Sequence, residues 1–418
     1  MRNKILAFYK SLNNDKKVLF WGVLFSLIIT LIFLIKLCFN GFWIWGDEIK
    51  MDATGQFGDF IGGVIGTIFS GLGFYFLYVT LSEQRTAINN QQAAFEKERF
   101  DSRFYELLKM HRENVSELKF DTRVLNEEEK KWDIVITENK AVFIGIYNQF
   151  VQCQNELKFF FNGTNRIYNS HYLKNISHLN LSNDYLNLLA KIDICYSIVF
   201  YGVGAEGLII LQKILIEKYK EQMINNILSY ISLKPANDDL ILKKWLSIPK
   251  GASKRKKILI TNEIFETRKK SLSKTKDFPD ISGGYHNRYI KYYGGHQFRL
   301  GHYYRHLYQT VNFVNLQSSF SYQLKYDCIR TLRAQLSTHE QMLLFLNSLS
   351  SMGRVWEINS EHLTELKNYT ADDFKLITKY NLIKNIPGEN IFGIPFKLFY
   401  PNVEYEGDVS KPIRPNYN

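Results

Sequence analysis

The sequence predicts a mainly α-helical protein, with a two-helix N-terminal transmembrane hairpin followed by a large α-helical cytoplasmic domain. Two observations predict the hairpin: residues 18–39 and 57–81 are apolar stretches. As helices that rise about 1.5 Å per residue, each is long enough to cross a bilayer core of about 30 Å. The third observation concerns the rest of the chain, where apolar residues recur at helical spacing without strand–helix alternation.

The first apolar stretch contains one charged residue, Lys36, near its far end. A cleavable signal peptide is the competing interpretation, because basic residues precede the stretch. However, the stretch is longer than a typical signal-peptide core, and no small-x-small cleavage site follows it. These features favour a transmembrane helix over residues 18–39.

The second apolar stretch contains a stripe of small residues at every fourth position: Gly58, Gly62, Gly66 and Ser70. Small residues at this spacing let helices approach closely in lipid, so we expect the stripe to pack against another helix. A glycine-rich loop is the alternative, but the surrounding Ile, Val and Phe side chains favour a helix.

Two charged residues lie at the same end of the predicted hairpin, Lys36 late in the first helix and Asp59 early in the second. An ion pair between them would lower the cost of placing each charge in the membrane. Alternatively, each side chain reaches the lipid headgroups separately. The sequence leaves both interpretations open.

The flanking charges predict the orientation of the hairpin. Five basic residues precede the first helix: Arg2, Lys4, Lys10, Lys16 and Lys17. The connecting loop, residues 40–56, has one basic and three acidic residues. The positive-inside rule therefore places both termini in the cytoplasm, with residues 1–17 as a cytoplasmic basic tail and 40–56 as an external loop.

The remaining chain divides into three predicted parts. Residues 82–118 form an amphipathic connecting helix, 119–385 an α-helical cytoplasmic domain, and 386–418 a tail of loop and short strand. Within the domain we expect a charged loop at 120–140 and helices at 141–161, 185–201 and 207–232. Ser337 and Glu340 form the pattern of a capping box at the start of a further helix, which Gly353 would end.

Several motifs bear on cofactors. The four cysteines are widely separated, which disfavours a disulfide framework or structural zinc site and suits a reducing compartment. His302 and His306 share a helix face, but their surroundings are cationic, so no metal site is predicted. The segment GVGAEG, residues 202–207, matches a dinucleotide-binding pattern. Because it follows a predicted helix rather than a strand, we interpret it as a glycine break between helices and expect no cofactor.

Basic residues concentrate between residues 250 and 335, where the net charge equals the +12 of the whole chain. Interleaved tyrosines suit a groove that binds nucleic acid, and the charges equally suit the anionic inner leaflet. A solvated basic loop with internally paired arginines is the third interpretation. The residues expected to make such contacts are Lys254, Arg255, Lys256, Lys257, Arg268, Lys269, Lys270, Arg299 and Arg305.

Arginine and histidine pairs suggest one enzymatic alternative. Arg299 with His306, and Arg333 with His339, fit the Arg-x(4–6)-His spacing of some helical toxin ribonucleases. The second pair straddles the predicted helix start at Ser337. No residue is assigned a catalytic role on this spacing alone.

Five segments occur in order along the chain: FGDFIGG, FEKERFDSRFYELLKMHRENV, VFYGVG, YYRHLYQTVNFV and LRAQLSTHEQMLLFLNSLSSMG. Together they resemble the AbiC-like family of phage abortive infection proteins, and the resemblance runs from about residue 18 to 355. The resemblance implies a bacterial inner-membrane protein that limits phage propagation. It transfers no catalytic residues. The basic segment 250–276 and the tail after 355 depart from the family's pattern.

These features together predict a membrane-anchored anti-phage defence protein. Its cytoplasmic domain would sense infection, through nucleic acid or a phage-derived protein, and the hairpin would oligomerise and act at the inner membrane. A membrane-tethered ribonuclease toxin and a non-catalytic recruiting scaffold are the alternatives.

Overall fold

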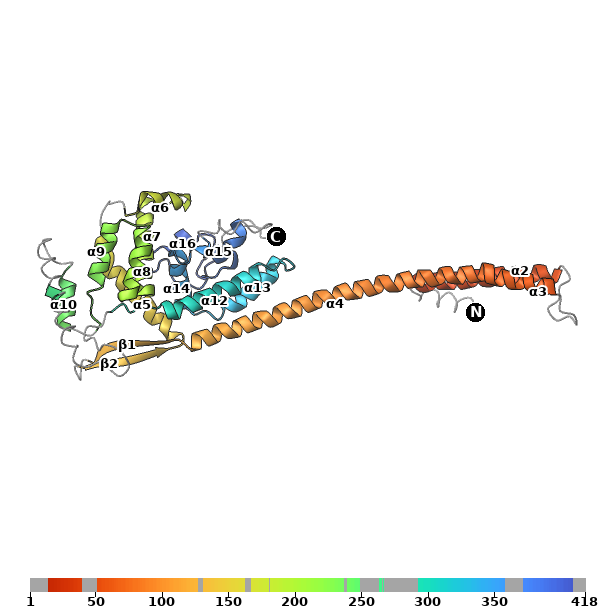
Figure 1. Cartoon of the computed structure of the whole chain (residues 1–418), viewed down its shortest axis with the longest axis horizontal. Helices are drawn as coiled ribbons and strands as arrows, with labels where there is room; N and C mark the ends of the chain where they lie inside the picture. The colour runs from red at the N-terminus through yellow and green to blue at the C-terminus, as the bar shows by residue number, and fades with distance from the viewer. Residues whose placement is uncertain are drawn as a thin grey trace. The chain divides into compact units, whose positions relative to one another are not determined.

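The computed structural model describes residues 14–39, 51–126, 131–161, 167–179, 181–236, 239–248, 263–264, 266, 292–357 and 371–408. The chain divides into two compact units, Met1–Arg103 and Phe104–Asn418. As predicted, the protein is mainly helical (Figure 1).

The first unit contains two antiparallel helical segments. Helix α2 (Asn14–Phe39) is followed by α3 (Met51–Phe60), a π-helical turn η1 (Ile61–Ile65) and the first part of α4 (Gly66–Ser116). The rings of Phe33 and Phe60 stack with their centroids 3.9 Å apart. At the other end, a Cβ atom on Gly22 would lie 2.7 Å from Leu72 Cδ1. These two contacts place α2 alongside the α3–α4 segment in opposite directions.

Close approach within this hairpin occurs at Gly22 and not at the small-residue stripe. No atom lies within 4 Å of where a Cβ would be on Gly58 or Gly62, and Gly66 meets only the Ile61 carbonyl of its own helix, at 3.8 Å. Ser70 is exposed. The stripe therefore faces open space within this chain. Its packing against another helix stays a prediction.

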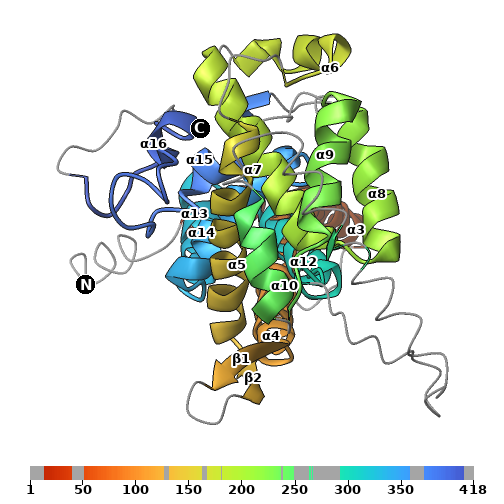
Figure 2. The same ribbon diagram turned by 90° about the vertical axis from the view of Figure 1, so that its left-hand side faces the viewer.

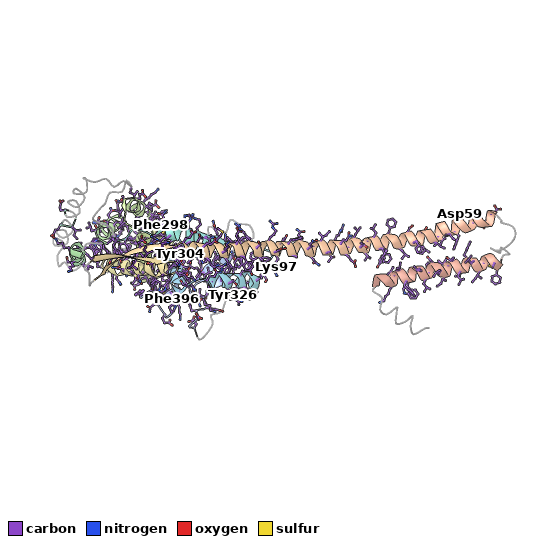
Figure 3. The ribbon with its side chains drawn as sticks, turned by 90° about the horizontal axis from the view of Figure 1, so that it is seen from below. Asp59, Lys97, Phe298, Tyr304, Tyr326 and Phe396 are labelled. Atoms are coloured by element: carbon purple, nitrogen blue, oxygen red, sulfur yellow. The ribbon has the colours of Figure 1, made fainter. Side chains whose placement is uncertain are left out.

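Lys36 and Asp59 lie toward the same end of the hairpin, since Phe33 contacts Phe60. Figure 3 shows Asp59 near the tip of this segment. Both side chains are exposed, and the described part of the first unit contains no ion pair between them. The predicted pair is therefore not formed within the chain, and it remains a hypothesis for the protein in its natural surroundings.

The second unit is a helical domain with one short sheet. After α4 its elements are β1 (Lys119–Asn126), β2 (Lys131–Glu138), α5 (Ala141–Leu157), η2 (Lys158–Phe160), α6 (Ser170–Asn175), η3 (Ser177–Leu179), α7 (Asn183–Tyr201), α8 (Ala205–Ile216), α9 (Glu221–Ile231), α10 (Asp239–Ser247), α12 (Gln297–Asn315), α13 (Tyr322–Arg333), α14 (Thr338–Leu349), η5 (Arg354–Trp356), η7 (Ala371–Phe374), α15 (Leu376–Tyr380) and α16 (Phe396–Phe399).

The core forms where α5, α7 and α14 pack against one another, with α12 against α7 (Figure 2). Side chains at these contacts, such as Phe143, Ile192 and Leu343, are fully buried. Helix α14 begins with the predicted capping box, in which the Ser337 hydroxyl and the Glu340 carboxylate each accept a backbone N–H of the other residue. Helix α14 ends at Leu349, four residues before the predicted stop at Gly353.

Two predictions about the domain are wrong. Residues 120–140 are largely an antiparallel hairpin of β1 and β2, with Lys119 opposite Glu138 and Asn126 opposite Lys131. The charged residues obscured a strand signal from β-branched residues at 134–136. The single helix expected at 207–232 is two helices, because the turn between α8 and α9 bonds to another segment. Asn169 N–H donates to the Lys218 carbonyl at 2.9 Å, and Lys220 N–H to the Ile167 carbonyl at 2.9 Å.

The tail after residue 385 combines a bridge between Ile391 and Ile394 with the one-turn helix α16. The buried Tyr400 hydroxyl donates to Ser348 Oγ of α14 at 2.7 Å, so this tail is part of the domain core.

Two glycine-containing segments cross where α7 ends. Gly202, at φ +74°, and Gly295, at φ +90°, occupy the left-handed region. A Cβ on Gly202 would lie 2.6 Å from Gly295 N, and one on Gly295 would lie 2.7 Å from the Tyr201 carbonyl oxygen. Only glycine fits both positions, because any side chain would collide with backbone. The GVGAEG motif is thus a glycine break between α7 and α8, as interpreted from the sequence.

Gly202→Ala should destabilise the domain by about 2 kcal/mol or more, since it combines backbone strain with a steric clash. Gly204→Ala is the matched control, because Gly204 has negative φ and open space around it. Thermal unfolding of the two variants in detergent should show a lower midpoint for Gly202→Ala alone. Equal midpoints would contradict the proposed role of the crossing.

Candidate functional site

The glycine crossing forms part of the wall of a surface pocket of about 650 Å³. The pocket lies between the end of α7, the Gly294–Gly295 segment, α12, Asn347 of α14 and the segment Met352–Trp356. Its volume is in the range of small-molecule sites, which is roughly 300–1,000 Å³. It is therefore the candidate functional site of the domain.

Aromatic side chains dominate the lining of the pocket: Phe200, Tyr201, Phe298, Tyr304, Tyr308 and Trp356. The Phe298 side chain is 67% exposed, which is unusual for a large apolar group at a domain surface. Figure 3 labels Phe298 and Tyr304, both on α12. The rings of Tyr308 and Trp356 pack edge to face, with their centroids 5.1 Å apart.

Among the lining side chains, Arg305 carries a positive charge, and no Asp or Glu lies among the described lining residues. Gln297, His302 and Asn347 add further polar groups. His302 and Arg305 are exposed. In the described part of the domain neither side chain has an ion-pair or hydrogen-bond partner. An anionic ligand would find uncompensated positive charge at Arg305.

The first turn of α12 reaches the pocket through Gln297 and Phe298. The backbone N–H groups of these two residues have no acceptor in the described ranges, whereas those of Arg299 and Leu300 bond to the His296 carbonyl at 3.0 and 2.8 Å. Unpaired N–H groups and the helix dipole favour negative charge at a helix N-terminus.

Tyr304 is 7% exposed and lies deep in the pocket wall beside Tyr196. Its hydroxyl is fully enclosed and its hydrogen-bonding neighbour is the Tyr196 hydroxyl, although the two are not well aligned. The neighbouring Tyr196 hydroxyl accepts from Asn347 Nδ2 at 3.1 Å. Burial raises the pKa of the Tyr304 phenol well above its ordinary value, so this group is a neutral donor.

A buried charged network holds the Met352–Trp356 wall in place. Asp193 of α7 is fully buried and accepts from Tyr219 Oη at 2.6 Å and from Ser351 N at 2.7 Å. Arg354 is 1% exposed and its Nε donates to the Leu349 carbonyl at 3.3 Å, at the end of α14. Burial favours the neutral form of Asp193, but the charges of Lys218 and Arg354 and these hydrogen bonds outweigh it, so the pKa of Asp193 is lowered.

A second network seats the chain segment that leads to Gly294. Lys234 is buried, with its Nζ atom 2.6 Å from Glu156 Oε1 and 3.4 Å from the centroid of the Tyr292 ring. The Tyr293 hydroxyl donates to Glu156 Oε2 at 2.6 Å. Both networks act on the walls of the pocket and lie behind its surface.

His296 precedes α12 and anchors its N-terminus. Its Nε2 donates to Gln149 Oε1 at 2.8 Å, and its Nδ1 accepts from Arg299 Nη1 at 3.3 Å. Burial and the charge of Arg299 lower the pKa of His296 to about 3, in agreement with a neutral ring. Arg299 Nε also donates to the Lys119 carbonyl at 2.6 Å, so this predicted site residue joins α12 to the β1–β2 hairpin.

The other three arginine and histidine candidates do not form one site with Arg299. The buried His306 donates from Nε2 to the Leu107 carbonyl at 2.9 Å. The buried Arg333 donates from Nη1 to the carbonyls of Tyr380 and Asn381, at 2.9 and 3.1 Å. His339 is half-buried with its ring against Tyr147. Each of these three residues therefore makes contacts inside the fold, and they do not come together with Arg299 at one surface.

Most of the predicted anion-contact residues, Lys254, Arg255, Lys256, Lys257, Arg268, Lys269 and Lys270, lie outside the described residues. Of the described ones, Arg305 lines the pocket and Arg299 contacts backbone. Sequence reasoning had included Arg305 for its charge, but it missed the pocket, because the walls come from segments far apart in the chain.

Comparison with known families identifies the region that contains α12 and α14. Residues 295–391 match the family model putAbiC, described as "Putative phage abortive infection protein". The match confirms the family resemblance indicated by the sequence motifs. No curated protein and no solved structure matches the chain significantly.

The family model matches a different part of the chain from the one over which the sequence motifs indicated a resemblance, residues 18–355. The family match begins at residue 295 and continues to 391, so the expectation that the chain after 355 departs from the family pattern is wrong as far as 391. Most of the pocket lining lies inside the match, with Phe200, Tyr201 and Gly294 outside it. Most of the pocket therefore lies in the region that the family model matches.

One buried histidine connects α4 to this region. His111 is 2% exposed, and neither ring nitrogen has a hydrogen-bond partner in the described structure. Its ring lies against Tyr303, with 5.4 Å between centroids, and stacks on His306 at 6.2 Å. Burial, His306 and Lys140 together lower the pKa of His111 to about 4.

The lowered pKa of His111 predicts acid sensitivity. Between pH 6.5 and 4 the unfolded chain binds a proton at this site and the folded chain does not, so stability falls as pH decreases through this range. At pH 5 the loss from His111 is about 2 kcal/mol relative to pH 7.5. His111→Leu should reduce the pH dependence of the unfolding free energy by that amount. The exposed His171 provides the control variant, His171→Leu. Identical pH dependence in both variants would show that His111 is not buried and neutral.

Proposed function

We propose that this protein is a membrane-anchored bacterial abortive infection protein that limits phage propagation from the inner membrane. The family match over residues 295–391 supports the role in phage abortive infection. The observation that carries the membrane location is the apolar surface of α2 and of the first part of α4.

These two helices are long and apolar enough to cross a membrane, by length and composition. Their large side chains are exposed instead of forming a core. Trp21 is 56% exposed, Leu31 58% and Phe74 73%. Each such side chain would gain about 1.5–3 kcal/mol if it left water. A lipid bilayer supplies the missing apolar surroundings for both helices together, and the hairpin then has both termini in the cytoplasm.

The unpartnered stripe of Gly58, Gly62 and Gly66 supports oligomerisation through the second membrane helix. Within the chain the close helix contact uses Gly22, which leaves the stripe available to another copy. Small residues let backbones approach closely enough for van der Waals attraction, which drives helix association in lipid. The π-helical turn at Ile61–Ile65 lies inside this stripe.

Helix α4 supplies the connection between detection and output. It continues without a break from Gly66 in the apolar segment to Ser116, where the β1–β2 hairpin follows. In our proposal the cytoplasmic domain senses infection, α4 transmits the change, and the assembled hairpins alter the permeability of the inner membrane.

The stripe can be tested in cells challenged with phage. Gly62→Leu combined with Gly66→Leu should abolish protection, because two large side chains block close packing between copies. The control is Gly71→Leu, since Gly71 is also surrounded by open space but lies about 140° around the helix from Gly66. The measurement is the efficiency of phage plating, with protein level and membrane association checked by immunoblotting.

Full protection by the double variant would contradict the role of the stripe. Dye entry during infection without RNA fragmentation supports an output at the membrane. RNA fragments without dye entry would instead support the ribonuclease alternative, and neither change would favour a recruiting scaffold.

A further inference from the structure

We propose that the aromatic pocket binds a nucleoside phosphate, which is the signal that this domain detects. The binding step stands independently of the membrane location. It rests on the proposed function only where binding is coupled to protection.

The pocket combines the two chemical features that a nucleotide needs. Aromatic rings of Tyr201, Phe298 and Tyr308 line it, and rings of this kind stack on nucleobases. Phe298 projects its side chain into solvent in the free protein although it is apolar. Arg299 covers the Phe298 ring with its guanidinium 4.1 Å from the ring centroid, which leaves the opposite face for a base.

The charge of Arg305 selects for an anion. Arg305 is without a partner in the described domain, and the lining contains no described carboxylate. The unpaired N–H groups of Gln297 and Phe298 add donors at the N-terminus of α12. A phosphate at this position would accept from Arg305 and from the helix terminus together.

The geometry distinguishes a nucleotide from a plain anion or an apolar molecule. A plain anion cannot stack on the aromatic lining. An apolar molecule would leave Arg305 and the α12 N–H groups uncompensated. The pocket volume of about 650 Å³ is large enough for one nucleotide.

Binding can be measured by isothermal titration calorimetry on the purified full-length protein in detergent micelles. The probes are AMP, ATP and GTP, compared with adenosine and inorganic triphosphate. We expect at least one nucleotide to bind more tightly than adenosine or triphosphate. Quenching of tryptophan fluorescence should follow the titration, since Trp356 lines the pocket.

Two variants separate the two features. Arg305→Gln should weaken nucleotide binding about tenfold or more, the loss of one charge-assisted contact, and leave adenosine binding unchanged. Phe298→Ala should weaken both nucleotide and adenosine binding. The control for charge is Arg112→Gln, an exposed arginine of α4 outside the pocket, which should bind like the original protein.

Three results would overturn the proposal. The first is the absence of nucleotide binding at millimolar concentration, and the second is binding that neither Arg305→Gln nor Phe298→Ala weakens. The third is tight binding of single-stranded RNA that mononucleotides do not displace.

Nucleotide binding by a protein that is soluble without detergent would refute the membrane proposal alone. Phage protection by a membrane-bound protein that binds no nucleotide would refute this inference alone.

Discussion

Apolar surface must leave water, and this constraint governs how the two parts of the chain differ. In the second unit, α5, α7 and α14 bury their apolar side chains against one another. In the first unit, α2 meets the α3–α4 segment at Phe33–Phe60 and at Gly22–Leu72 and leaves many large side chains exposed. Under the membrane location that we propose, lipid would surround these residues and would also account for glycines that weaken a helix in water.

The candidate site depends on a different constraint, the close crossing of two backbone segments. Gly202 and Gly295 let the end of α7 meet the segment before α12, so the two segments form one wall of the pocket. The opposite wall depends on Asp193, which fixes the turn after α14 through Ser351. Losing either feature would displace aromatic side chains of the pocket wall.

Local signals in the sequence predicted local structure well. The apolar spacing at 185–201 predicted α7, and Ser337 with Glu340 predicted the start of α14 with its hydrogen bonds. The β1–β2 hairpin was missed because charged residues masked its β-branched positions. The pairing of Gly202 with Gly294–Gly295 was also missed, because spacing within one segment contains no information about contacts about 90 residues away.

The candidate residues show the same limit. Arg333 and His306 had the residue types of a nuclease, but their hydrogen bonds to backbone carbonyls became evident only from the fold. Asp193 is a carboxylate in the apolar second half of α7, and a charge in such surroundings needs a buried partner. Its partners Tyr219 and Ser351 come from distant segments, so their identity required the structure.

The central claim, that α2 and the start of α4 lie within a bilayer, is tested most directly by alkaline carbonate extraction of membranes from cells that make the full-length protein. The account predicts that the protein stays in the membrane pellet after carbonate and is released only by detergent. Recovery in the carbonate supernatant, or in the soluble fraction after lysis, would contradict it.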